Sequence, residues 1–140
     1  MSGYLLVRVG NVRYGLPLTA VVEVVDTAQV FPVPGAHAAV RGVTSIRDRL
    51  VTCVRLGALI GGGNASEEPG GTMAVVDGGG RTIALEVDDA EGIVRDEPVP
   101  APPGWDVPLT QGVTRYGDEL IPILDLSGVV ERLIESGAGV

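Results

Sequence analysis

The chain has a single cysteine, Cys53, in 140 residues, so no disulfide can form within it. That absence excludes a secreted fold held together by disulfides. Cys53 stands in an apolar segment with no base nearby in the sequence, which favours a buried and inert thiol. No apolar run approaches the roughly 20 residues of a membrane span, and the N-terminal segment turns polar too early for a signal peptide. We therefore expect a cytoplasmic protein without direct membrane insertion.

Basic side chains are also few. Ten Lys and Arg residues against eighteen Asp and Glu residues give a formal net charge of −8. The basic residues are scattered, whereas binding to nucleic acid or to an anionic membrane needs them clustered. The composition therefore argues against both kinds of partner. Aromatic residues make up only 4 % of the chain, so its core must be built from Val, Leu, Ile and Ala.

The residues of a catalytic or metal site are missing as well. The one histidine, His37, and Cys53 have no obvious partners, which argues against a Cys/His nucleophile pair and a His-rich metal site. Asp88 and Asp89 could form a metal-binding pair, but neighbouring strand residues point to opposite faces, so capping a turn explains them better. The Gly-rich stretch at 61–71 is not followed by the Gly-Lys-Ser/Thr of a phosphate loop. We expect no catalysis, no cofactor and no metal.

What the chain does contain is a long internal repeat. GVTSIRDRLVTCVRLGALI, residues 42–60, lies without a gap over GVTRYGDELIPILDLSGVV, residues 112–130. The preceding segments match too, with residues 10–25 lying over residues 79–94 at an offset of 69. A long repeat present only twice favours a duplicated barrel over a solenoid, which needs at least three units. The identical pairs of the first match are Gly42/Gly112, Val43/Val113, Thr44/Thr114, Asp48/Asp118, Leu50/Leu120 and Leu56/Leu126.

Short alternating segments between turn residues predict about ten strands in two matched sets of five. We therefore predict an all-β fold with short helices, made of two small β-barrels whose closure would remove exposed sheet edges. One sub-barrel is expected at about 10–62 and the other at about 72–130, with strands partly exchanged and a linker at 61–71. Apolar residues at helical spacing predict a C-terminal amphipathic helix at about 126–135, capped by Asp125.

Several motifs follow one another in a specific order. An opening hairpin ends in YGL at 14–16, and VVEV follows at 21–24. GVTSIRD at 42–48 comes after a Pro-rich loop, and LEVDDAEGIV at 85–94 and LIPILDL at 120–126 complete the second half. Taken together over nearly the entire chain, these motifs resemble the CheW-like domain of bacterial and archaeal chemotaxis, whose signature reads Gly-Val-Ile/Thr-Asn-Leu-Arg-Gly.

The resemblance implies two five-stranded, SH3-like barrels around a shared hydrophobic interior. It also implies a non-catalytic adaptor that couples methyl-accepting chemoreceptors to a CheA-type histidine kinase. In that family one barrel docks on the regulatory domain of the kinase, and the groove between the barrels takes the helical tip of a receptor. Residue by residue, the resemblance places Arg47, Glu23, Val21 and Val24 on the receptor-facing surface, and Val87 and Asp88 at the kinase-facing edge.

Alternatives exist for the receptor-facing residues. Arg47 could be a structural turn residue that pairs with Asp48 or Glu23, and Val21 and Val24 could be plain core residues. An enzyme or a small-ligand binder on the same scaffold would need convergent polar side chains in a pocket, which the sequence does not supply.

The chain also departs from the family pattern. Ser45 and Asp48 stand where the signature has Asn and Gly, and Arg55 stands where the family usually has an acid. These departures leave open a specialised module that binds only the kinase or only the receptor, outside flagellar chemotaxis.

Overall fold

The computed structural model describes residues 3–34, 38–60, 71–95 and 98–135. His37 and nearly all of the expected linker at 61–71 lie outside the described residues. Within them the chain forms strands joined mostly by tight turns, with two α-helices and one 3-10 turn. The elements are β1 (Tyr4–Val9), β2 (Val12–Pro17), η1 (Leu18–Ala20), β3 (Val21–Asp26), β4 (Val40–Ile46), β5 (Arg49–Arg55), α1 (Leu56–Ile60), β6 (Thr72–Gly78), β7 (Arg81–Val87), β8 (Asp89–Val94), β9 (Thr110–Tyr116), β10 (Glu119–Leu124) and α2 (Leu126–Glu135).

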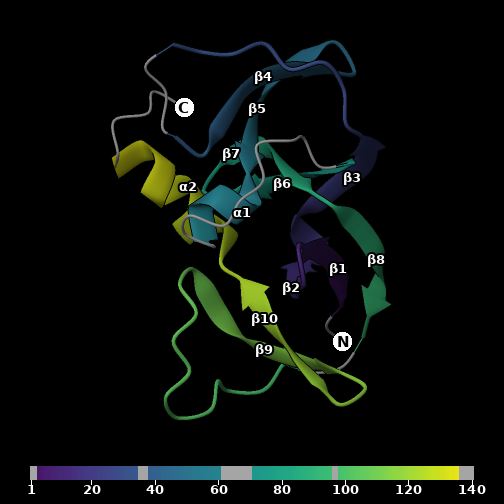
Figure 1. The fold of residues 1–140 in the computed structure, drawn as a ribbon, viewed down its shortest axis with the longest axis vertical. Coiled ribbons are helices and arrows are strands. Elements are labelled where there is room, and N and C mark those ends of the chain that lie inside the picture. Colours follow the sequence, from purple (N-terminus) through teal and green to yellow (C-terminus); the bar gives the residue numbers. More distant parts are fainter. Residues whose placement is uncertain (1–2, 35–37, 61–70, 96–97, 136–140) are drawn as a thin grey trace.

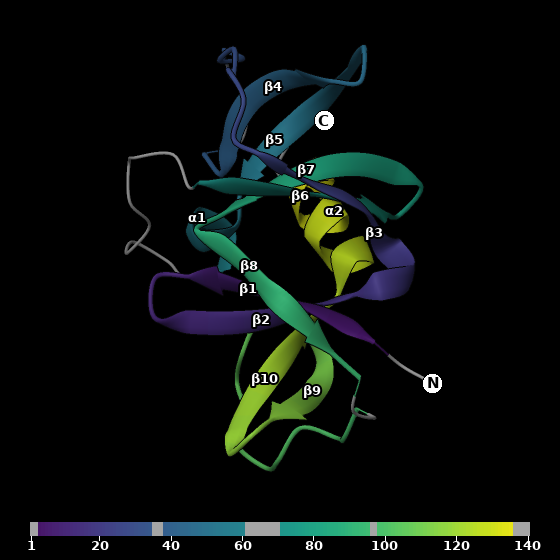
Figure 2. The same cartoon turned by 90° about the vertical axis from the view of Figure 1, so that its right-hand side faces the viewer.

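The strands form two five-stranded sheets at opposite ends of the molecule (Figures 1 and 2). Sheet A has the order β8-β1-β2-β10-β9, and sheet B has the order β3-β6-β7-β5-β4. The two orders correspond strand by strand. β8, β1, β2, β10 and β9 of sheet A occupy the places of β3, β6, β7, β5 and β4 of sheet B. The two parallel pairs correspond as well, because Cys53 pairs with Ala84 and Ile123 pairs with Gly15. The predicted duplication into two matched sets of five strands is therefore confirmed.

Among the described residues, strand ladders do not close either sheet into a barrel, which differs from the closure we expected. The gap in each sheet is instead spanned by one isolated bridge. Phe31 and Val43 exchange N–H···O bonds of 2.8 and 2.9 Å, and Val99 and Val113 exchange bonds of 2.8 and 3.2 Å. Prolines explain why these bridges stay short: Pro32 follows Phe31, and Val99 lies between two prolines. A proline has no N–H to extend a ladder, so each lobe is SH3-like without a continuous barrel seam.

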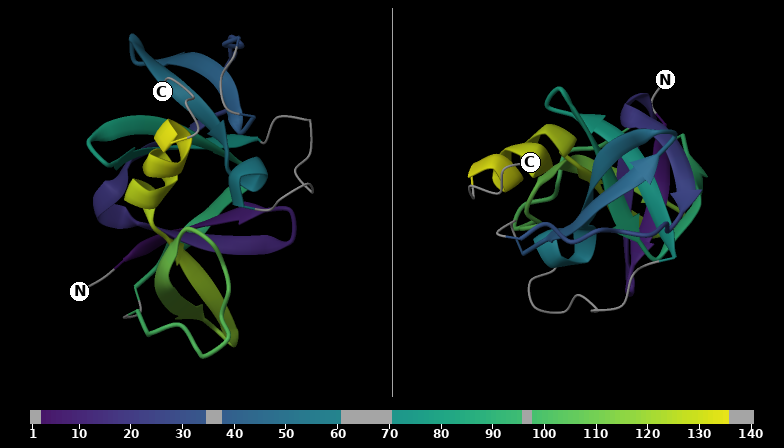
Figure 3. Two further views of the ribbon diagram at one scale, coloured as in Figure 1. Left: turned by 90° about the vertical axis from the view of Figure 1, so that its left-hand side faces the viewer. Right: turned by 90° about the horizontal axis from the view of Figure 1, so that it is seen from above.

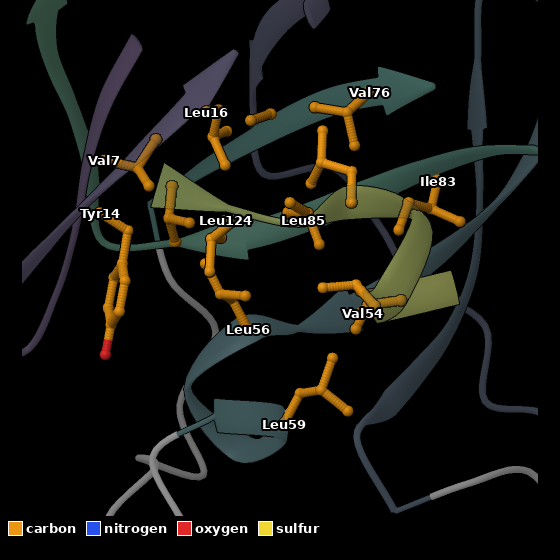
Figure 4. Close-up of a cluster of buried hydrophobic side chains, with 14 of the residues drawn as sticks. Val7, Tyr14, Leu16, Val54, Leu56, Leu59, Val76, Ile83, Leu85 and Leu124 are labelled. Atoms are coloured by element: carbon orange, nitrogen blue, oxygen red, sulfur yellow. The ribbon is translucent and has the colours of Figure 1, made fainter. Parts of the chain in front are cut away.

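The main core lies between the two sheets (Figure 4). Along each strand every second side chain points inward, and both sheets contribute such side chains to this core. Both helices pack against it. Burying each large aliphatic side chain stabilises the fold by about 1.5–3 kcal/mol. Each sheet also encloses a smaller cluster of its own, and Cys53 lies fully buried in that of sheet B, as predicted. Side chains labelled in Figure 4 include Val7, Tyr14, Leu16, Val54, Leu56, Leu59, Val76, Ile83, Leu85 and Leu124.

Helix α2 packs its apolar face against this core and contacts β6 (Figure 3). Its first turn is capped as predicted, because the Gly128 N–H donates to Oδ1 of Asp125 at 3.1 Å. Among the described residues, none of the helices combines the length and apolar character needed to cross a membrane.

Candidate protein-binding surface

The β4–β5 turn carries the arginine that the family resemblance singles out. Arg47 and Asp48 form a two-residue turn between the paired residues Ile46 and Arg49. Both turn residues are left-handed, with φ of 50° and 65°, which is the pattern of a type I′ hairpin turn. Asp48 thus adopts the conformation that glycine would take in the family signature, and Asp tolerates it better than most residues. At this turn, 78 % of the Arg47 side chain is exposed.

Arg47 reaches Glu23, which lies on the opposite edge strand of sheet B. Its Nε donates to both carboxylate oxygens at 2.9 Å. Only 19 % of the Glu23 side chain is exposed, so most of it is shielded from solvent. The hydrogen bond to Glu23 and the charge of its carboxylate raise the pKa of Arg47. The structure therefore brings together two of the predicted receptor-facing residues, and the contact matches the pairing that the structural alternative proposed.

The contact with Glu23 occupies one end of the Arg47 guanidinium. A guanidinium has five N–H donors, of which the two terminal nitrogens carry four. Within the residues that the structure describes, none accepts a hydrogen bond from the terminal nitrogens of Arg47. Glu23 thus fixes the direction of the side chain and leaves its planar fork open. Such a fork binds a carboxylate through two parallel hydrogen bonds.

Strand β3 presents apolar side chains beside this arginine. It pairs with β6 along one edge and has no strand ladder along the other. Val21 is half-buried and packs against the main core, which fits the core-packing alternative. Val24 is 43 % exposed and lies on the other face of the strand from Glu23, since adjacent strand residues alternate. A surface that uses both Val24 and Arg47 must therefore wrap round the free edge of β3.

Val22 is an exposed residue of β3 that the sequence analysis did not select. It is 52 % exposed and lies at an irregularity of the β3–β6 pairing, between Val21 and Glu23. The signal was present in the sequence, because VVEVV has valine at positions of both faces. A strand with one solvated face would alternate apolar and polar residues.

The two residues predicted for the kinase-facing edge have other roles in the fold. Val87 is only 2 % exposed and belongs to the main core, so its side chain offers no surface for a partner. The alternation of Leu85 and Val87 with polar residues is the ordinary pattern of a buried strand face. Asp88 is exposed, but its carboxylate accepts the Gly10 N–H at 2.6 Å and lies 3.7 Å from the Arg8 guanidinium. Asp88 therefore orders the β1–β2 turn.

Sheet A arranges the equivalent charges differently. The repeat offsets place Gly117 and Gly92 where sheet B has Arg47 and Glu23. Arg13 of β2 instead bridges Glu91 at 2.7 Å and Glu119 at 2.9 Å, using its Nε and one terminal nitrogen. The hydrogen bond to Glu91 is the largest cause of its raised pKa. Arg13 thus forms ion pairs with two carboxylates of its own chain, whereas Arg47 forms an ion pair with one.

One buried ion pair lies at the other end of sheet B. Glu86 of β7 is 6 % exposed and accepts hydrogen bonds from Nη2 of Arg41 at 2.6 Å and from Nε at 3.2 Å. Cys53 Sγ lies 3.9 Å from the same carboxylate. Burial, reinforced by the charge of Glu86, raises the pKa of the Cys53 thiol to about 12. Within the described residues, no group of three or more His, Cys, Asp and Glu side chains is placed to hold a metal ion.

Comparisons with known proteins identify a family and a fold. The family model of the CheW-like domain matches residues 3–133. The crystal structure of the scaffolding protein TtCheW from Thermoanaerobacter tengcongensis superposes with a TM-score of 0.81. The two sequences are 20 % identical, and the match covers 91 % of this chain and 86 % of the other, which shows a shared fold. No curated protein matches the chain.

Proposed function

The chain belongs to the CheW-like domain family, and on that premise we propose that it is a non-catalytic adaptor that couples chemoreceptors to a CheA-type histidine kinase in chemotaxis. The observation that carries the proposal is the state of Arg47. Glu23 holds the guanidinium through Nε, while most of the side chain and both terminal nitrogens remain accessible. An arginine oriented in this way is preorganised to receive a carboxylate from another protein.

The receptor-facing surface consists of Arg47, Glu23, Val22 and Val24 around the free edge of β3. A receptor tip is a helical hairpin, and its apolar face would contact the exposed valines. An acidic side chain on the same hairpin would pair with the open fork of Arg47. Val21 supports this surface from below by packing on the core.

Of the two residues predicted for the kinase-facing edge, one is available at the surface. With Val87 buried, Asp88 is the remaining residue of the predicted edge, and it already binds the β1–β2 turn. This observation favours a second candidate function, a specialised CheW-like module that binds the receptor without the kinase. Separate binding assays with the kinase domain and the receptor hairpin distinguish the two functions.

The test is Arg47→Glu in the full chain, with Arg115→Glu as the matched control. Arg115 is an exposed arginine of β9 in the equivalent hairpin of sheet A. We expect Arg47→Glu to abolish receptor-dependent kinase activation and to weaken capture by a receptor hairpin fragment at least about tenfold. The control should retain both, and the melting temperature of each variant should stay close to that of the parent.

Three outcomes are informative. Capture of the parent chain by both a CheA regulatory domain and a receptor hairpin supports the adaptor. Capture by the receptor hairpin alone supports the specialised module. If Arg47→Glu unfolds the protein while Arg115→Glu does not, Arg47 is a structural residue and the receptor-facing surface is misplaced.

A further inference from the structure

A cavity of about 260 Å³ opens at one end of sheet A. It lies where the start of β1 meets the ends of β2 and β8. Its polar lining comes from Tyr4, Thr19, Arg95 and Gln111, and Pro17 and Leu18 contribute apolar walls. Among the described lining residues, Arg95 is the one that carries a charge, and none is an acid.

The internal repeat allows the lining of this cavity to be compared with the equivalent residues of sheet B. The repeat offsets place Pro17 over Glu86 and Gln111 over Arg41. In sheet B those positions form the buried carboxylate–guanidinium pair, whereas in sheet A both line the cavity. Sheet A therefore has neither the carboxylate nor the guanidinium of that pair at these two positions.

Arg95 supplies a cation from a different position. It directly follows β8, and its Nη1 lies 3.5 Å from the point where a Cβ on Gly3 would be. The same absent Cβ would lie 2.7 Å from Leu18, so the lack of a side chain at Gly3 leaves room for the guanidinium beside the cavity. Within the described residues, Arg95 forms no ion pair.

We propose that this cavity binds a carboxylate, with the Arg95 guanidinium as its main partner and the Gln111 amide and Thr19 hydroxyl as further donors. A volume of 260 Å³ equals the liquid share of about nine waters, enough for a carboxylate on a short apolar stem. Tyr4 and Leu18 would contact that stem. The carboxylate belongs either to an acidic side chain of a protein partner or to a small free acid. The proposal does not depend on the adaptor function.

The experiment is a titration of the isotope-labelled full chain followed by amide chemical shifts at constant ionic strength. The probes are propionate, its neutral isostere propionamide, and blocked Ala-Ala-Glu-Ala-Ala and Ala-Ala-Gln-Ala-Ala peptides. We expect saturable shifts at Tyr4, Thr19 and Gln111 with the two carboxylates and none with the two amides. Arg95→Gln should weaken the binding at least about tenfold, and Arg115→Gln should leave it unchanged.

A second variant tests the repeat argument. Pro17→Glu places a carboxylate at the position of Glu86, and it should displace propionate by pairing with Arg95. Stronger binding of the Glu peptide than of propionate assigns the site to a protein partner, and binding of propionate alone assigns it to a free acid. Absence of saturable shifts, equal shifts with the amides, or full affinity in Arg95→Gln would overturn the proposal. None of these results bears on capture by the receptor or the kinase.

Discussion

Sheets A and B share one strand order but differ in where they place charge. Their backbone contacts correspond closely, since the Arg55 N–H donates to the Ala39 carbonyl at 2.7 Å and the Asp125 N–H donates to the Leu109 carbonyl at 2.8 Å. Their ion pairs do not correspond, because sheet B holds Arg41 with Glu86 and Arg47 with Glu23, and sheet A has other residues at all four positions. The backbone contacts are therefore what the lobe requires, and the polar side chains are free to differ with function.

The residues conserved between the copies support the same conclusion. Gly42, Val43 and Thr44 recur as Gly112, Val113 and Thr114, and they lie where the preceding Pro-rich loop crosses the edge strand. Both threonines are fully buried, and the Thr44 hydroxyl donates to the Gln29 carbonyl at 2.8 Å. Three of the six identities that reveal the repeat thus lie at the bridge that spans the gap in each sheet.

The largest expected difference between the lobes is the loss of stability when Gly42 or its equivalent Gly112 is replaced by alanine. A Cβ on Gly42, where φ is 151°, would lie 2.1 Å from the Phe31 carbonyl oxygen, whereas a Cβ on Gly112 would lie 3.5 Å from that of Val99. The first contact forces the backbone apart and breaks the Phe31–Val43 bridge. We expect Gly42→Ala to lower the free energy of unfolding by about 3 kcal/mol or more, and Gly112→Ala by about 1 kcal/mol.

Urea unfolding of the two variants measures this difference directly. The control is built in, because the substitution is the same and the positions are equivalent. Similar losses in both variants would mean that the loop before β4 moves aside easily, and that the bridge contributes little to sheet B.

The next largest effect concerns the buried ion pair. Arg41→Met leaves the Glu86 carboxylate buried without its main partner and should cost about 2–4 kcal/mol in urea unfolding. Gln111→Met, at the equivalent position of sheet A, lines an open cavity and should cost much less. The double variant Arg41→Met with Glu86→Leu should recover most of the stability, since no charge then remains buried. Failure to recover would show that the pair also fixes the packing around Cys53.

Much of the fold could be predicted from the sequence, because the repeat and the alternation of apolar residues depend on local spacing. The helix at 126–135 and its Asp125 cap follow from the same kind of pattern. The order of strands within each sheet could not be predicted from local spacing, because the exchange of hairpins between the lobes depends on long-range packing. Barrel closure was overestimated, because the prolines beside Phe31 and Val99 limit each seam to one bridge.

The candidate site was harder to predict than the fold. Motif matching selected Arg47 and Glu23, which are 24 residues apart and form an ion pair, but it also selected Val87, which is buried. A motif match shows which residue types recur at which positions. It does not show whether a side chain points to the core or to the surface. Val22 was missed because the resemblance assigned no role to this position of the VVEV motif, although it lies on the same exposed face of β3 as Val24.

The smallest expected effect on stability belongs to Arg47→Gly, which gives sheet B the turn residue of sheet A. Glycine adopts the φ of 50° without the Cβ penalty that Arg47 bears, and this gain offsets the loss of an exposed ion pair. We expect the melting temperature to stay within about 2 °C of the parent or to rise. Receptor capture should nevertheless fall as it does in Arg47→Glu, because the open fork is gone. A drop in melting temperature of more than about 5 °C would instead mean that Arg47 holds sheet B closed. The reason to expect the first result is that sheet A, with Gly117 and Gly92 at these positions, keeps the same strand order and the same bridge.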